Sequence, residues 1–109
     1  MNDTGNLWGQ KKETLSDKSA EKEYGISHDE ILEAINSREL QYKLGNMHGN
    51  PWFRLLRVEV ERLVEKKYGY DYLKEKKVNK QLSEINRELK TLKKRILELE
   101  KRRDELVNM

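Results

Sequence analysis

The last third of the chain carries the feature that most restricts its fold, a run of apolar residues spaced alternately four and three apart. This spacing places Leu82, Leu89, Ile96 and Arg103 at position a of a heptad repeat. Four consecutive heptads predict a long helix with one apolar seam, and a helix exposing such a seam alone is poorly stable. The sequence therefore predicts a coiled coil that makes a homodimer. Its dimerisation residues are Val78, Leu82, Ile85, Leu89, Leu92, Ile96, Leu99 and Leu106.

Three arrangements of this seam are open from the sequence. Two parallel copies would set Glu88 against Lys93 and Arg95 against Glu100, which is favourable for charge. An antiparallel pair centred on the middle of the seam would mainly set Glu88 against Arg95, and it would keep Arg103 away from its own copy. The charges favour the parallel pair slightly. In the third arrangement, the seam folds back on a small domain of the same chain.

Composition limits the rest of the chain to a small folded part. The protein has 109 residues, of which 39% are charged and 35% are apolar, so a large core is impossible. Cysteine is absent, which excludes disulfides, thiolate metal sites and thiol nucleophiles, and suits a reducing compartment. No apolar run approaches the ~20 residues of a membrane span, and residues 1–4 begin neither a signal peptide nor a transit peptide. We therefore expect a cytoplasmic protein with no membrane partner.

Catalytic and metal-binding patterns are also missing from the sequence. His28 and His48 are the only histidines, and neither has a carboxylate at a ligand spacing, so we expect no metal site. We find no nucleophile motif, glycine-rich phosphate loop or pair of acids suited to acid–base chemistry. The prediction is a protein that is not an enzyme, with no cofactor and no small-molecule substrate.

A predicted β-hairpin followed by a helix occupies the middle of the chain. Apolar and polar residues alternate over 40–44, which predicts a strand, and residues 45–51 hold the turn-forming glycines, asparagines and only proline. Residues 52–56 read as the return strand, with Phe53 and Leu55 on one face and Trp52, Arg54 and Leu56 on the other. An amphipathic helix over about 58–68 follows, and Gly69 can end it.

The N-terminal part predicts a flexible arm and two short helices. Residues 1–14 are polar and aperiodic, with Trp8 either loosely docked or available to a partner. Ser16 can cap a helix over 17–24 that ends at Gly25, and residues 27–30 form a capping box that opens a second helix over 28–36. Helix, short turn and helix together indicate a helix-turn-helix.

The predicted fold class is thus α+β and mostly α. It combines a small winged helix-turn-helix-like domain with a long C-terminal coiled-coil helix. We assign a flexible arm to residues 1–14, the small domain to 15–70, and the basic extension with its coiled coil to 71–109.

Charge is unevenly distributed along this arrangement. Acidic residues outnumber basic ones over 16–36, whereas basic residues dominate 37–57 and 73–81. A polyanion would therefore meet the hairpin and the start of the last helix. The second helix normally enters the major groove in a helix-turn-helix, yet this one carries Asp29, Glu30 and Glu33, which phosphates would repel. Either that helix is a structural support, or the unit does not bind DNA.

Residues 15–77 resemble the class of small DNA-binding domains that includes MerR and excisionase proteins. Within this class, the chain is most similar to the C-terminal DNA-binding subdomain of xeroderma pigmentosum group A protein. The matching segments are AEKEY at 20–24, LQYKL at 40–44, His48 with Trp52, RLLR at 54–57, the helix at 60–68, and Gly69 with YLKEKK at 72–77.

This resemblance implies DNA contacts by particular residues. Trp52 would stack at a helix end or junction, Lys43 and Arg54 would contact phosphates from the strands, and the lysines over 74–80 would line a helical extension. The chain departs from the repair protein in two ways, because it has no cysteine for a zinc module and its last helix is a heptad seam. The resemblance therefore implies DNA contact but not the DNA-repair role.

The predicted function is non-catalytic DNA binding, as a small transcriptional regulator or nucleoid-associated adaptor. The alternative is a protein–protein adaptor whose acidic second helix binds a basic partner. Trp52 can be read as a core residue or as a stacking platform, and the basic residues as a solvated surface or as phosphate contacts. The candidate nucleic-acid-binding residues are Lys43, Asn46, His48, Asn50, Trp52, Arg54, Arg57, Lys74, Lys76, Lys77 and Lys80.

Overall fold

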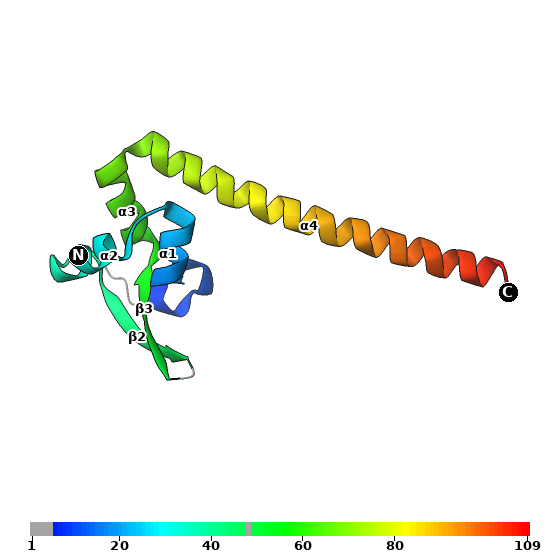
Figure 1. Ribbon diagram of the computed structural model, residues 1–109, viewed down its shortest axis with the longest axis horizontal. Coiled ribbons are helices and arrows are strands. Elements are labelled where there is room, and N and C mark those ends of the chain that lie inside the picture. Colours follow the sequence, from blue (N-terminus) through cyan, green and yellow to red (C-terminus); the bar gives the residue numbers. More distant parts are fainter. Residues whose placement is uncertain (1–5, 48) are drawn as a thin grey trace. The chain divides into compact units, whose positions relative to one another are not determined.

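A computed structural model of the chain describes residues 6–47 and 49–109, and Figure 1 shows the order of their elements. The protein is mostly helical, with a small antiparallel sheet and a long C-terminal helix. The elements are the 3-10 turns η1 (Leu7–Gly9) and η2 (Lys11–Glu13), β1 (Thr14–Ser16), α1 (Asp17–Tyr24), α2 (His28–Asn36), β2 (Tyr42–Met47), β3 (Asn50–Leu56), α3 (Arg57–Tyr68) and α4 (Tyr70–Val107). Two compact units divide the chain, residues 1–77 and residues 78–109.

Local capping explains why α1 and α2 begin and end where the sequence predicts. The Ser16 side chain accepts a hydrogen bond from the Ser19 amide, and Gly25 ends α1 with a left-handed φ of 67°. The capping box of Ser27 and Glu30 is complete, since each side chain accepts a hydrogen bond from the other residue's amide. Both helix predictions are confirmed.

The three strands form one sheet in the order β1-β3-β2, with both neighbouring pairs antiparallel. The hairpin pairing runs further than predicted, because Asn46 pairs with Pro51 inside the segment that was expected to turn. β1 pairs only with residues 54–56 of β3, so Pro51 needs a ladder partner on just one side and is tolerated in the strand.

One face of this sheet carries the hydrophobic core. Leu55, which the alternation predicts on the same face as Phe53, is fully buried, and Phe53 packs against the core. The helices cover this face with buried apolar side chains. Those of α1, α2 and α3 include Ala20, Tyr24, Ile31, Ala34, Val60, Leu63 and Val64, and α4 adds Leu73 from its first turn.

The segment before α1 differs from the predicted flexible arm. Residues 6–16 form two 3-10 turns and strand β1, and Trp8 is only 9% exposed. The reason is tertiary, because β1 pairs with β3 across a separation of about forty residues and brings the preceding turns onto the sheet. Residues 1–5 lie outside the described part of the chain.

The joint between α3 and α4 is a single glycine with a positive φ. Gly69 has φ 95°, a value that favours glycine, and α4 begins immediately after it at Tyr70. The rings of Tyr68 and Tyr72 lie 4.8 Å apart, and the Tyr72 hydroxyl donates to the Tyr24 carbonyl at 2.9 Å. These contacts dock the first turns of α4 on the small domain.

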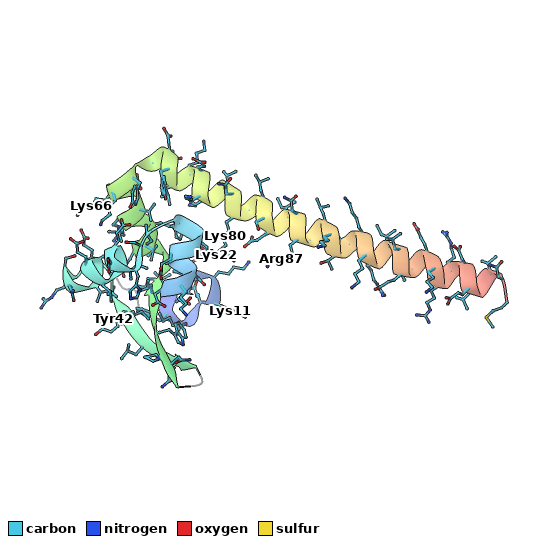
Figure 2. All side chains as sticks on the ribbon, in the orientation of Figure 1. Lys11, Lys22, Tyr42, Lys66, Lys80 and Arg87 are labelled. Carbon is cyan, nitrogen blue, oxygen red and sulfur yellow. The ribbon has the colours of Figure 1, made fainter. Side chains whose placement is uncertain are left out.

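Residues 78–107 are one continuous stretch of α4, with side chains projecting on all sides (Figure 2). The eight apolar seam residues are each 42–61% exposed. None of the helices in residues 6–47 and 49–109 is both long enough and apolar enough to span a bilayer.

Candidate nucleic-acid interface

The hairpin presents a basic and aromatic surface on the side opposite the core. Lys43 lies directly across from Arg54, and the next pair on the same face of the ladder is Gly45 with Trp52. Because side chains alternate along a strand, these positions share the face that Leu55 does not use. We call Lys43, Gly45, Trp52 and Arg54, together with Trp8, the hairpin face.

Trp8 lies close to both cations of this face. The Lys43 Nζ is 4.8 Å and the Arg54 Cζ is 5.9 Å from the centroid of the indole, distances at which cation–π attraction operates. Arg54 Nη2 also donates a hydrogen bond to the Trp8 carbonyl oxygen. The sequence predicts Trp8 only as loosely docked or available to a partner, because the three residues of β1 are too few to show the strand that brings it to the sheet.

Trp52 rests on the backbone of the neighbouring strand. A Cβ added at Gly45 would lie only 2.3 Å from Trp52 Cε2 and 2.4 Å from Cζ2, so the indole covers the glycine directly. Trp52 is half-buried and lies on the face opposite the core. The glycine is what allows the ring to lie so close to β2, and one side of the ring is thereby covered.

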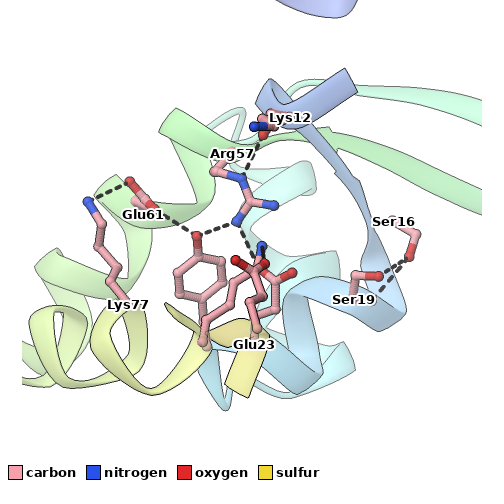
Figure 3. Close-up of polar contacts among 10 residues, drawn as sticks. Lys12, Ser16, Ser19, Glu23, Arg57, Glu61 and Lys77 are labelled. Atoms are coloured by element: carbon pink, nitrogen blue, oxygen red, sulfur yellow. Dashed lines mark hydrogen bonds and ion pairs between the residues drawn. The ribbon is translucent and has the colours of Figure 1, made fainter. Parts of the chain in front are cut away.

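Arg57 is not a free cation, contrary to its predicted place among the phosphate contacts. Its Nε donates to the Lys12 carbonyl at 2.8 Å, and its Nη1 donates to Glu23 at 2.7 Å and to the Tyr24 hydroxyl at 2.8 Å (Figure 3). The side chain is 20% exposed. Arg57 therefore ties α3 to α1 and η2, and its principal donors are used inside the domain.

Tyr24 and Glu61 continue this network. The Tyr24 hydroxyl donates to Glu61 at 2.7 Å, and Lys77 lies 3.6 Å from the other Glu61 oxygen (Figure 3). Burial, aided by the hydrogen bond to Glu61, raises the pKa of Tyr24 far above its usual value. Burial alone would lower the pKa of Arg57, but Glu23 and Tyr24 reverse this, and the net shift is upward.

The lysines at the start of α4 are mostly engaged by the chain itself. Lys77 pairs with Glu61, and the Lys76 Nζ lies 5.1 Å from the Tyr72 ring centroid. Lys80 lies 4.0 Å from Glu84 one turn further along the helix, whereas Lys74 is exposed. The structure therefore does not present the four lysines as one row of free cations.

The hairpin also carries exposed polar and apolar groups outside the hairpin face. Asn46 and Asn50 are exposed next to the turn, and His48 lies outside the described residues. On the core side, Tyr42 (labelled in Figure 2) is 48% and Leu44 is 69% exposed, and the Tyr42 ring meets Phe53 edge to face. The alternation of apolar and polar residues over 40–44 predicts that Tyr42 and Leu44 lie on one face of the strand. It does not show that the helices leave both side chains exposed.

The acidic residues of α2 divide into two groups. Glu30 accepts hydrogen bonds from the Ser27 amide and the Tyr68 hydroxyl, and it lies 3.5 Å from Lys67. The Tyr68 hydrogen bond is the main cause that lowers the pKa of Glu30. Asp29 and Glu33 are exposed. Glu30 is thus a structural residue, whereas the other two carboxylates face solvent.

Comparisons with models of protein families, with curated proteins and with solved structures find no match for this chain. Within residues 6–47 and 49–109, no three His, Asp or Glu side chains come close enough together to hold a metal ion.

Proposed function

We propose that this protein binds DNA without catalysing a reaction, as a small transcriptional regulator or nucleoid-associated adaptor. The observation that carries the proposal is the cross-strand pair of Lys43 and Arg54, set beside Trp8 and Trp52 on one face of a hairpin. The proposal includes DNA binding by the small domain in the manner of a winged helix-turn-helix. This agrees with the resemblance of residues 15–77 to MerR and excisionase proteins.

The chemistry of the hairpin face suits a phosphate backbone with bases beside it. Lysine and arginine supply the phosphate-driven part of affinity, and the half-buried Trp52 offers a ring surface to a base. The Arg54 guanidinium has five N–H donors, and the Trp8 carbonyl oxygen accepts from only some of them. Lys43 is exposed. Asn46 and Asn50 next to the turn are candidates for finer reading of the groove.

The charges of α2 limit how the small domain can approach DNA. Asp29 and Glu33 would face phosphates if α2 entered the major groove, and their repulsion disfavours that approach. The proposed contact is therefore made by the hairpin, with the exposed Lys74 at the start of α4 as a second contact. Arg57 acts in this scheme only by holding the domain together.

The test is fluorescence anisotropy of labelled duplex and forked DNA, titrated with the full chain at about 50 and 200 mM salt. Lys43→Gln should weaken binding and reduce the salt slope by about one. The matched control is Lys94→Gln, which makes the same change of charge on α4 at a position outside the seam. Absence of binding at the lower salt, or equal losses in the two variants, would contradict the proposal.

A second candidate function, protein–protein adaptor, is favoured by the exposure of Asp29 and Glu33 on one short helix. Reversal of both charges, with Glu30 kept because it caps α2, should then abolish capture of a basic protein partner. In the DNA-binding protein proposed above, the same reversal should leave DNA affinity unchanged or raise it.

Self-association through α4 completes the proposal. The seam leaves eight apolar side chains 42–61% exposed along a single helix, and pairing with a second copy would cover them. A dimer would also present two hairpins to one DNA molecule, so the second contact would be intramolecular and the avidity higher.

A further inference from the structure

We infer that two copies of α4 pair in parallel and in register, which brings the N-terminal ends of the two helices together. This inference rests on the proposed self-association and does not depend on DNA binding. It is carried by the positions and exposure of the seam residues and by the charges that flank them.

The number of apolar layers separates the possible arrangements. In a parallel, in-register pair, each of the eight apolar seam residues meets its own copy, so there are eight apolar layers. In the antiparallel pair centred between Leu89 and Leu92, Val78 meets Arg103, and Leu106 lies opposite Glu75. This pairing therefore has only six apolar layers. A shift of the antiparallel pair by one heptad in either direction again leaves six. Because burial of apolar surface drives association, the parallel pair is the more stable one.

The flanking charges favour the same choice. In the parallel pair, Glu88 of one copy faces Lys93 of the other, and Arg95 faces Glu100, each contact occurring twice. Among the described residues, Glu88, Lys93 and Glu100 make no ion pair within the chain, whereas Arg95 lies 3.7 Å from Glu98. The antiparallel pair would use mainly Glu88 with Arg95.

Arg103 defines the register and the number of strands. It is the one charged residue at an a or d position between Val78 and Leu106, and in the parallel pair it meets its own copy. A single polar residue at an a position lowers stability but specifies register and oligomeric state. Its place one layer before the end of the seam limits this cost to the last turns of the coiled coil.

Cysteine cross-linking tests the orientation directly, because the natural chain has no cysteine. Leu82→Cys and Leu99→Cys chains, one of them carrying a size tag, are mixed, unfolded, refolded together and oxidised in a glutathione buffer. The two positions are about 25 Å apart along one helix, too far for a disulfide unless the copies bring them together.

The parallel pair should yield only the two disulfides that join like positions. A product dominated by the mixed disulfide between positions 82 and 99 would overturn the inference while leaving self-association intact. A monomeric mass for the natural chain in sedimentation would instead show that the proposed self-association itself fails. DNA binding by the hairpin is measured separately, in the anisotropy titration.

A charge exchange gives an independent test that keeps the apolar seam intact. Lys93→Glu would set like charges against Glu88 in the parallel pair and should raise the dimer Kd by about tenfold. Adding Glu88→Lys should restore the Kd, because the two charges attract again. In the antiparallel pair, Glu88→Lys would face Arg95 instead, so a double variant weaker than Lys93→Glu alone would overturn the inference.

Discussion

At the scale of single residues, the structure separates cations that hold the fold from cations that face solvent. Arg57 binds Lys12, Glu23 and Tyr24 at once and is mostly buried, whereas Arg62 on the same helix is exposed. Both look alike in the sequence, because each is a basic residue on the predicted third helix or at its edge.

Arg57→Ala should lower the free energy of unfolding by about 2 kcal/mol, since it removes the hydrogen bonds from the guanidinium to Glu23, the Tyr24 hydroxyl and the Lys12 carbonyl. Denaturant unfolding followed by circular dichroism measures this change. Arg62→Ala is the matched control and should change stability by less than about 0.5 kcal/mol. Equal effects of the two variants would show that the Arg57 network contributes nothing to stability.

The hydrogen bond from Tyr68 to Glu30 predicts a pH-dependent contribution to stability. It lowers the pKa of Glu30 below its ordinary value of 4.5 in the folded state. A depressed pKa contributes stability that is present above the unfolded pKa and is lost as the pH falls through the folded one. Tyr68→Phe should therefore destabilise the protein at neutral pH, and its difference from the natural chain should shrink below about pH 4.5.

Thermal unfolding of both chains between about pH 3 and 7 measures this difference. Tyr70→Phe is the control, because Tyr70 is 62% exposed. A Tyr68→Phe effect that stays constant over the whole range would show that the phenol does not act through the ionisation of Glu30.

At the scale of elements, the hairpin depends on the close approach of Trp52 to Gly45. The glycine lies in an ordinary strand conformation, so its role is to leave room for the indole. Even a single methyl group added at Gly45 would therefore change the shape of the hairpin face.

Gly45→Ala should destabilise the protein by about 1–3 kcal/mol, because the added methyl group forces the Trp52 ring away from β2. Tryptophan fluorescence and denaturant unfolding report the movement and its cost. In a Trp52→Ala background the same change should be neutral or stabilising, since alanine suits a strand better than glycine. Gly9→Ala, with nothing within 4 Å of the added atom, is the control. Equal costs of Gly45→Ala in both backgrounds would contradict this account.

At the scale of the whole molecule, the proposed function depends on the apolar seam, whose side chains remain exposed. Replacement of Leu89 and Leu92 by Asp should produce monomers by light scattering, because charges in adjacent layers cannot be buried there. The matched control places two Asp residues at Thr91 and Leu97, exposed positions outside the seam, and should keep the mass of the natural chain. No change in mass with the seam variant would show that the seam does not join two copies.

Much of the local structure could be predicted from the sequence, because its causes lie within a few residues. Ser16, Gly25 and the Ser27–Glu30 box define α1 and α2, and alternation over 52–56 places Phe53 and Leu55 on one face of β3. The heptad spacing over 78–106 likewise predicts the long helix, because its period matches helical turns. Among the candidate site residues, the sequence places Lys43 and Arg54 on the two strands of the hairpin, and only the register in the structure sets them opposite each other.

Tertiary contacts alone decided which of these residues remain available. The pairing of β1 with β3 brings Trp8 to Lys43 and Arg54, although these residues are far apart in the chain. The packing of α3 and α4 assigns Arg57 to Glu23 and Lys77 to Glu61. Capping and periodicity act over one helical turn or one strand spacing, so they carry no information about partners dozens of residues away. The sequence by itself thus determined the elements and their apolar faces, whereas the folded structure determined which charges stay free for a partner.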